Sequence, residues 1–185
     1  MKKKASVLWV DLEMTGLEVE RDRILEVAAI GTDWEFNEIV RMEGVVKVPE
    51  ELMKERMVGE FWEKNAKARD GLMKQNKKGI STEEMDEKLR KWIDESFVES
   101  AITTDPTYQG KIILAGNSVY NDKKFIEKEW PLVSERLHYR MLDVSAWKVV
   151  FQARNKFFTK KEEHRAMDDI LGSISELKYY MEKIK

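Results

Sequence analysis

The sequence lacks cysteine, which excludes a disulfide scaffold, a cysteine-ligated zinc site and a thiol nucleophile. It also lacks a long apolar run, since no stretch approaches the roughly 18 residues that a membrane span needs. The basic start is followed by the apolar stretch 7–10, which ends at Asp11 and is too short for the core of a signal peptide. We therefore expect a cytoplasmic protein, or one that has lost an organelle presequence, with no membrane partner.

The chain also has little net charge, because 33 lysine and arginine residues are opposed by 35 aspartate and glutamate residues. A protein that grips a long polyanion uses many basic contacts, so this balance argues against a long nucleic-acid partner and leaves a short one open. The length of 185 residues predicts a single domain over 1–185. Residues 96–110 are polar and contain a turn signal, so we interpret them as a loop or an insertion.

Apolar, β-rich runs predict five strands, and the first three are expected to be antiparallel because short loops join them. Helical patterns follow the third strand and then alternate with the last two. Breaks are expected at Gly59 and Gly71. Ser81 with Glu84 forms a capping box, and Ser145 is expected to cap the helix that follows the fifth strand. The pattern predicts a mixed α/β domain. Its strands would cover residues 5–11, 24–32, 40–48, 112–115 and 139–144, and its helices 50–76, a segment after Ser81, 122–130, about 145–154 and 162–184.

Two carboxylates, Asp11 and Glu13, stand two residues apart at the end of the first predicted strand. Residues at this spacing point to the same face of a strand, so the two side chains lie side by side. They either face solvent beyond the end of the strand or form a site for a hard cation such as Mg²⁺ or Mn²⁺.

His164, one of two histidines, stands at the start of the strongest helical pattern and is followed by Asp168 and Asp169. Histidine suits general-base work near neutral pH, whereas acids near a helix N-terminus are also favoured simply by the helix dipole. Helical geometry does not choose which acid would act with His164. Asp122, which opens an earlier helix, has the same two interpretations. Four acids from three segments and one histidine are together the set of a two-metal phosphodiester hydrolase.

The order D-x-E, then Asp, then H-x4-D resembles the DEDDh family of 3′–5′ exonucleases. The resemblance is closer to the oligoribonuclease family within this group, and it extends over about residues 7–180. The motifs that carry it are WVDLEMTGL at 9–17, RDRI at 21–24, GNS at 116–118, HYR at 138–140, LDVS at 142–145 and HRAMDD at 164–169.

This resemblance implies a ribonuclease H-like fold, with a mixed five-stranded sheet flanked by helices. It implies an exoribonuclease that hydrolyses short RNA, chiefly dinucleotides, to 5′-mononucleotides with two divalent cations, Mg²⁺ or Mn²⁺. His164 would be the general base. The family pattern selects Asp169 over Asp168, so the metal ligands would be Asp11, Glu13, Asp122 and Asp169.

The resemblance also implies a set of substrate contacts. Leu17 would wedge between the two bases, Met14 would contact the substrate as well, and Trp62 would line the base pocket. A cap on the 5′ phosphate would come from Ser118, Tyr139, Arg140 and Ser145. Because Tyr139 and Arg140 would reach into the partner's site, a homodimer is implied. Leu17, Trp62 and Tyr139 are also residue types that pack in cores and interfaces.

The sequence departs from the family around Trp62, where Glu63 and Lys67 replace an asparagine and a histidine and Asp70 replaces a serine. The basic segment 156–160 has no assigned role. An alternative function is a DEDDh exonuclease acting on the 3′ ends of longer RNA or single-stranded DNA. A catalytically silent nucleic-acid-binding domain and, more remotely, a glycosidase with Asp11 and Glu13 as its acid pair are further alternatives.

Overall fold

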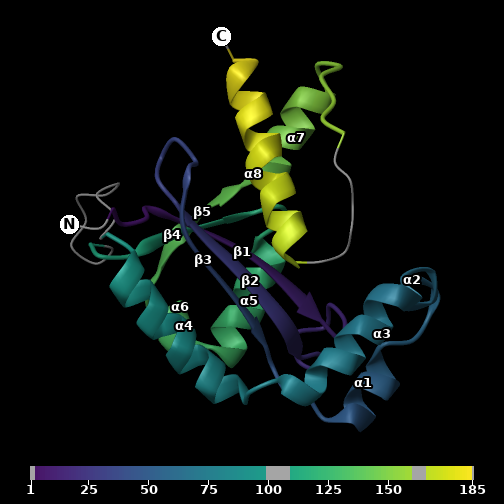
Figure 1. Cartoon of the computed structure of the whole chain (residues 1–185). Helices are drawn as coiled ribbons and strands as arrows, with labels where there is room; N and C mark the ends of the chain where they lie inside the picture. Colours follow the sequence, from purple (N-terminus) through teal and green to yellow (C-terminus); the bar gives the residue numbers. More distant parts are fainter. Residues whose placement is uncertain (1–2, 99–108, 160–165, 185) are drawn as a thin grey trace.

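A computed structural model describes residues 3–98, 109–159 and 166–184 (Figure 1). Its strands form one sheet with the order β3-β2-β1-β4-β5. β1 pairs antiparallel with β2 and parallel with β4, while β2–β3 is antiparallel and β4–β5 is parallel. The expected mixed five-stranded sheet is therefore confirmed. The strands are β1 (Val7–Met14), β2 (Ile24–Thr32), β3 (Glu38–Val45), β4 (Ile112–Gly116) and β5 (Leu137–Asp143).

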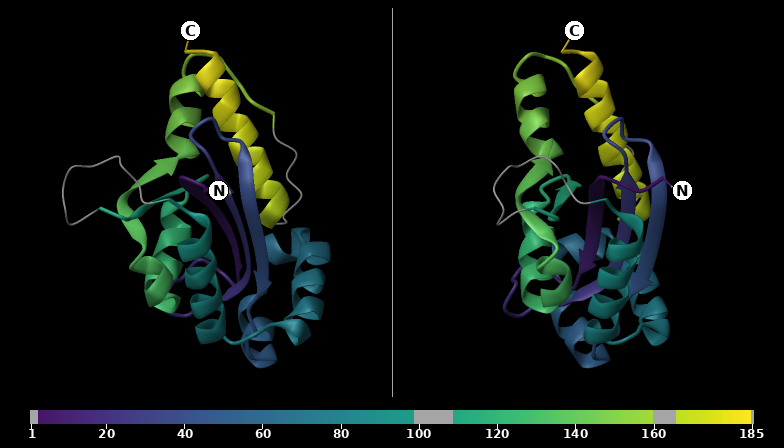
Figure 2. Two further views of the ribbon diagram at one scale, coloured as in Figure 1. Left: turned by 60° about the vertical axis from the view of Figure 1, so that its left-hand side comes forward. Right: turned by 90° about the vertical axis from the view of Figure 1, so that its left-hand side faces the viewer.

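Helices cover both faces of this sheet. The helices α4, α5 and α6 pack on one face, and α7 and α8 pack on the other. The helices α1 to α3 form a separate group with its own small core, far from the C-terminus of the chain (Figure 2). The bounds are α1 (Glu50–Arg56), α2 (Glu60–Lys64), α3 (Ala66–Gln75), η1 (Asn76–Lys78), α4 (Thr82–Ser96), α5 (Tyr120–Glu129), α6 (Pro131–Ser134), α7 (Val144–Gln152) and α8 (Ala166–Glu182).

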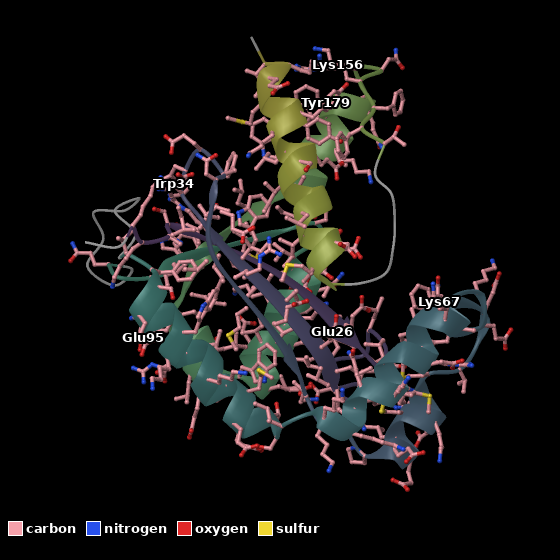
Figure 3. All side chains as sticks on the ribbon, in the orientation of Figure 1. Glu26, Trp34, Lys67, Glu95, Lys156 and Tyr179 are labelled. Carbon is pink, nitrogen blue, oxygen red and sulfur yellow. The ribbon has the colours of Figure 1, made fainter. Side chains whose placement is uncertain are left out.

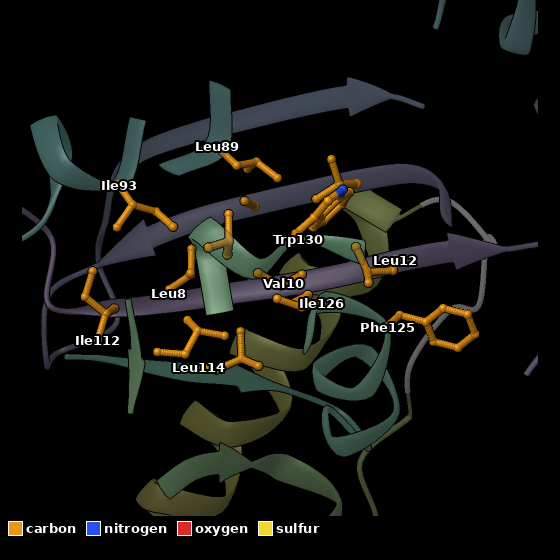
Figure 4. Close-up of a cluster of buried hydrophobic side chains, with 14 of the residues drawn as sticks. Leu8, Val10, Leu12, Leu89, Ile93, Ile112, Leu114, Phe125, Ile126 and Trp130 are labelled. Carbon is orange, nitrogen blue, oxygen red and sulfur yellow. The ribbon is translucent and has the colours of Figure 1, made fainter. Parts of the chain in front are cut away.

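Alternate residues of the central strand β1 enter different cores, as the two-residue period of a strand requires. Leu8 and Val10 pack with residues of α4, α5 and α6 (Figure 4). Trp9 is fully buried on the opposite face, in the core that α7 and α8 complete. Asp11 and Glu13 continue the row of Trp9, so the sheet aims both carboxylates to the side on which α8 lies.

Several predicted boundaries differ from the structure. The first strand was predicted over 5–11 but continues to Met14, because β2 pairs with it as far as Ile24. The third strand ends at Val45 rather than 48. Gly71 does not break a helix, since α3 runs through it, whereas Gly59 does separate α1 from α2 with a φ of 91°. Glycine tolerates that left-handed backbone without steric cost.

Two predicted helix caps have different outcomes. Ser81 and Glu84 form the predicted capping box at the start of α4. The prediction that Ser145 caps α7 is wrong, because Asp143 is the N-cap and accepts a hydrogen bond from the backbone N–H of Ser145. The greater part of the segment 96–110 and the first residues of the predicted helix 162–184 lie outside the described residues. None of the helices that the structure describes is long and apolar enough to cross a membrane.

Candidate active site

Three carboxylates meet where the carboxyl end of β1 passes the first turn of α8. They belong to Asp11, Glu13 and Asp169, and one oxygen of each lies within 4.8 Å of the others. The strand supplies two of them from one face, and α8 crosses that face with Asp169 in its first turn. Asp168, its neighbour, is exposed and is not part of this group. The structure therefore distinguishes the two acids that helical geometry alone left equivalent.

Asp122 approaches the same strand from α5, on the other side of the backbone. Its Oδ1 accepts a hydrogen bond of 3.1 Å from the N–H of Leu12, the residue between Asp11 and Glu13. Burial raises the pKa of Asp122 to about 7, and the charge of Asp143 acts in the same direction. The hydrogen bond from Leu12 opposes that rise. Asp122 thus lies next to the three-carboxylate group without being one of its members.

This donor set fits divalent cations. Carboxylates within 4.8 Å of one another repel unless positive charge lies between them. All three are partly exposed, so an ion can reach them. Carboxylate oxygens are the preferred ligands of hard cations. The acidic group therefore indicates the use of divalent metal.

The structure does not describe the position of the predicted general base. His164 lies outside the described residues, which resume at Ala166, the first residue of α8. Asp169 stands in the first turn of that helix. The role of His164 stays a prediction.

A pocket of about 530 Å³ opens beside Glu13, at the end of β1. Met14, Leu17 and Trp62, three of the predicted substrate contacts, all line it. Leu17 projects from the loop after β1 with 72% of its surface exposed, whereas Trp62 is only 6% exposed. The indole N–H of Trp62 donates to the backbone oxygen of Thr15 at 3.2 Å. Trp62 therefore forms a fixed wall, and Leu17 is an apolar projection at the rim.

An ion pair that the sequence reasoning missed holds the rim of this pocket. Arg56 of α1 donates to both oxygens of Asp22, at 2.8 and 3.0 Å, and to Glu18 at 2.7 Å. Asp22 is fully buried and also accepts hydrogen bonds from the hydroxyl of Thr15 and the N–H of Glu18. The loop that carries Leu17 is thereby tied to α1. Asp22 belongs to the RDRI motif, but nothing in the sequence pattern pairs it with Arg56.

Two predicted phosphate contacts, Ser118 and Ser145, lie together where β4 and β5 end. Their hydroxyl oxygens are 3.0 Å apart, and Ser118 has a left-handed backbone with a φ of 51°. Asp143 accepts hydrogen bonds from the N–H groups of both serines, at 3.0 and 2.9 Å. Asp143 therefore holds the pair in place. Its position in the LDVS motif was the available signal for this role, which the sequence reasoning missed.

Asn117 joins these serines to α8. Its side-chain oxygen accepts from the hydroxyl of Ser145 at 3.3 Å, and its amide donates to Ser173 and Glu176 at 2.9 and 3.1 Å. Ser173 in turn donates to the backbone oxygen of Asp169 at 2.9 Å. Side-chain hydrogen bonds thus connect the serine pair with the helix that supplies a carboxylate. Asn117 belongs to the GNS motif, but the sequence did not predict this linking role.

Tyr139 and Arg140 lie on β5 and are both exposed. The Nε of Arg140 donates to the Tyr139 hydroxyl at 2.8 Å, and its guanidinium lies 5.3 Å from the centre of the tyrosine ring. Tyr139 and Arg140 are thus positioned as a surface pair.

Glu63 and Lys67, two of the departures from the family near Trp62, are exposed and are not among the residues that line the pocket.

Comparison with known proteins identifies the relatives of this chain. The RNase_T exonuclease family model matches residues 8–177. An oligoribonuclease of Francisella tularensis subsp. tularensis is 37% identical over 188 residues, which cover 100% of this chain and 98% of that protein. The mitochondrial oligoribonuclease of Homo sapiens is 38% identical over 186 residues, or 96% of this chain and 73% of that protein.

Solved structures show the same fold at lower sequence identity. Exonuclease I from Methylocaldum szegediense superposes with a TM-score of 0.67 at 15% identity, over 97% of this chain. The zinc-bound complex of E. coli exonuclease I with single-stranded DNA gives a TM-score of 0.64 at 16% identity, over 98%. This chain spans about two fifths of those longer chains, 41% of each. These neighbours support the expected ribonuclease H-like fold.

The family match runs from β1 into α8, and so includes Asp11, Glu13, Asp122 and Asp169. The match covers 98% of the Francisella protein and 73% of the human protein, so the similarity is not confined to one motif. The chain belongs to the oligoribonuclease family of exonucleases.

Proposed function

We propose that this exonuclease hydrolyses very short RNA, chiefly dinucleotides, from the 3′ end and releases 5′-mononucleotides. The observation that carries the proposal is the pocket of about 530 Å³ that shares Glu13 with the carboxylate group. A base in that pocket brings its own phosphate next to the three acids. The net charge of −2 agrees with a substrate that has few phosphates.

Asp11, Glu13 and Asp169, together with Asp122, would hold two divalent cations, Mg²⁺ or Mn²⁺. When bound, such ions supply positive charge for the phosphate oxygens and lower the pKa of water. The protein contributes the placement of four acids around one strand. Because α5 and α8 approach β1 from opposite faces, the acids surround the carboxyl end of the strand rather than lining one side of it.

His164 takes the proton of the attacking water in this proposal. A neutral imidazole has the right basicity near pH 7, and the residue precedes the helix that carries Asp169. The scissile phosphate stays on the 3′-terminal nucleotide, since the product is a 5′-mononucleotide. Leu17, at the exposed rim of the pocket, lies between the two bases and separates one from the other. Met14 contacts the terminal nucleotide.

The far end of the substrate limits its length. Ser118 and Ser145 offer hydroxyls to the 5′ phosphate, and a guanidinium can bind a phosphate with two hydrogen bonds. We place Tyr139 and Arg140 of the partner subunit over the same phosphate, which makes the working unit a homodimer of one-domain chains, acting in the cytoplasm. A closed cap of this kind excludes a strand that continues beyond two nucleotides.

Hydrolysis of 5′-phosphorylated RNAs of two to ten nucleotides, with Mn²⁺ or Mg²⁺ and beside the His164→Ala variant, tests the proposal. We expect a sharp preference for the dinucleotide, with turnover lost in the variant and after chelation of the metal. A rate that is independent of RNA length would instead favour an exonuclease that acts on longer RNA or single-stranded DNA. Absence of turnover with either metal would favour a silent binding domain.

A further inference from the structure

The side chain of Asn117 makes three hydrogen bonds, and each end of its amide has a different partner. The nitrogen donates to Glu176 at 3.1 Å and to Ser173 at 2.9 Å, both on α8. The oxygen accepts from the hydroxyl of Ser145 at 3.3 Å. The amide therefore directs its hydrogens toward α8 and its oxygen toward the serine pair, Ser118 and Ser145.

Glu176 is a buried acid, with 1% of its surface exposed. One of its oxygens accepts from Asn117, and the other accepts a hydrogen bond of 2.7 Å from the hydroxyl of Tyr180, which is fully buried. The same stretch of α8 contributes Ile174, Leu177 and Tyr180 to an apolar core, so an apolar side chain at 176 would satisfy packing. Because burial of a carboxylate costs free energy unless donors compensate, the specific contribution of Glu176 is its two acceptor oxygens.

These acceptor oxygens determine how the Asn117 amide is turned. An ionised carboxylate accepts hydrogen bonds and cannot donate them, whereas an asparagine amide donates from one end and accepts at the other. Glu176 therefore attracts the NH₂ group of Asn117, and the amide oxygen is left facing Ser145. A side chain at 176 that could donate as well as accept would not impose this direction.

The same asparagine anchors the turn that carries Ser118. The φ of Ser118 is 51°, a left-handed conformation that a residue with a side chain adopts only at a cost. Its backbone N–H donates to the Ser145 oxygen at 2.8 Å, so the backbone of one serine depends on the hydroxyl of the other. Backbone strain of this kind persists where the surrounding contacts hold it, and it is concentrated at functional sites. Asn117 contributes to that hold by tying the turn to α8.

We propose that Asn117 and Glu176 are positioning residues for the 5′ phosphate of the substrate. They hold Ser145, and through it Ser118, in the arrangement that receives a terminal phosphate, without touching the phosphate themselves. This inference rests on the proposed function, which assigns that phosphate to the two serines. The hydrogen bond from Ser145 to Asn117 is long, so a phosphate oxygen, which is charged and accepts more strongly, can take the hydroxyl hydrogen.

The test compares a 5′-phosphorylated RNA dinucleotide with the same dinucleotide bearing a 5′ hydroxyl. The wild-type protein is expected to have a lower KM for the phosphorylated form. Asn117→Ala should raise that KM by about fivefold, the effect of one net hydrogen bond, and should leave kcat and the KM of the 5′-hydroxyl form nearly unchanged. Glu176→Gln keeps the volume but can turn an NH₂ group toward Asn117, so it should change the ratio of the two KM values in the same direction.

Asn76→Ala is the matched control. Asn76 is also a buried asparagine, and its amide makes two hydrogen bonds of 2.8 Å, with the backbone N–H and the backbone oxygen of Val48. It follows α3, the helix of Lys67, which Figure 3 shows apart from the end of α8 that carries Tyr179. The control should lose stability, as Asn117→Ala does, but should keep the wild-type ratio of the two KM values. Thermal unfolding of each variant measures the loss of stability.

Calorimetric binding of both dinucleotides with the metal chelated separates the positioning role from the proposed function, because no turnover is involved. A wild-type preference for the 5′ phosphate that Asn76→Ala keeps and that Asn117→Ala and Glu176→Gln reduce supports the positioning role. The same preference in all four proteins would overturn it, and dinucleotide hydrolysis would then leave the proposed function intact. Equal binding of the two dinucleotides by the wild type would overturn the phosphate site itself, and with it the proposed limit on substrate length.

Discussion

Asp168 and Asp169 are neighbours in sequence, but successive residues of a helix point about 100° apart, and only Asp169 joins the carboxylates of β1. We predict that Asp169→Asn lowers kcat by more than about a hundredfold, since even residues that merely support metal ligands cost 10- to 100-fold. Asp168→Asn, which removes the same charge from the exposed side of α8, is the control and should retain most activity. Steady-state kinetics with Mn²⁺ measures both, and equal losses would refute the choice of Asp169.

The buried carboxylate of Asp22 predicts a pH-dependent contribution to stability. Burial alone raises the pKa of Asp22, but hydrogen bonds from Arg56, Glu18 and Thr15 and the charge of Arg56 outweigh it and hold the pKa below the ordinary 3.8. Stabilisation from a lowered carboxyl pKa is present above pH 3.8 and is lost as the pH falls through the lower, folded-state value. The Arg56 pair should therefore stabilise the protein at neutral pH and not in strong acid.

Arg56→Gln tests this at the level of a single side chain. We expect it to lower the free energy of unfolding at pH 7 clearly more than Lys54→Gln does. Lys54 pairs with Glu50 on the same helix, but both of those side chains are mostly exposed. Urea titrations from pH 7 down to below pH 3.8 should show the effect of Arg56→Gln shrinking with acidity. A difference that stays constant over this range would contradict the role given to Asp22.

At the residue scale, the positions of the acidic groups were easier to predict than the solvent exposure of individual side chains. The spacing of Asp11 and Glu13 on a strand was sufficient to place their carboxylates side by side. Trp62 was also placed at the pocket, but its burial and the exposure of Phe61 depend on how α2 packs on Leu25 and Met53. Arg56 and Asp22 are 34 positions apart, and no local pattern joins them.

At the scale of elements, the ends of the strands were harder to predict than their existence. The apolar run of β1 stops at Leu12, so the sequence alone ends the strand near Asp11. Backbone pairing with β2 carries it on to Met14, because hydrogen bonding between strands does not depend on which side chains are apolar. Both carboxylates of β1 are therefore held in a paired strand rather than beyond its end.

The cap of α7 links an element to the proposed phosphate site. Asp143→Ala removes the acceptor for the N–H groups of Ser118 and Ser145, so we expect a loss of about 1 kcal/mol in stability together with a higher KM for 5′-phosphorylated dinucleotides. Ser81→Ala removes the cap of α4, which is not part of the site, and should cost similar stability with no change in KM. Chemical denaturation and kinetics on both variants measure the two effects. A KM that rises equally in both would mean that the cap acts only through global stability.

At the scale of the whole molecule, the proposed homodimer predicts complementation between two inactive variants. Asp169→Asn chains lack one of the proposed metal ligands but retain Arg140, and Arg140→Ala chains retain all the acids. In a mixture that exchanges subunits freely, about a quarter of the sites regain an intact acid group and an intact arginine from the partner. Activity should rise when the two preparations are combined, and size-exclusion chromatography should give the mass of a dimer. A mixture no more active than the average of its components would place Arg140 in its own chain's site.

The order of the elements also explains how much of the fold the sequence could predict. Three strands in succession and then strands separated by helices leave few ways to build a sheet, and β1 at its centre follows from pairing with both β2 and β4. The expected mixed sheet was therefore correct. The breaks within 50–76 were only partly correct, because Gly71 lies inside α3, where a helix tolerates one glycine at modest cost.

The carboxylate group unites Asp11, from a strand made early in synthesis, with Asp169, from a helix made late. A chain that is still being translated can pair β1 with β2, but until α8 emerges from the ribosome it has neither the third acid nor the helix that covers Trp9. The growing polypeptide therefore lacks the complete carboxylate group for most of its synthesis. Short RNA fragments near the ribosome can therefore meet the assembled site only after that helix has docked.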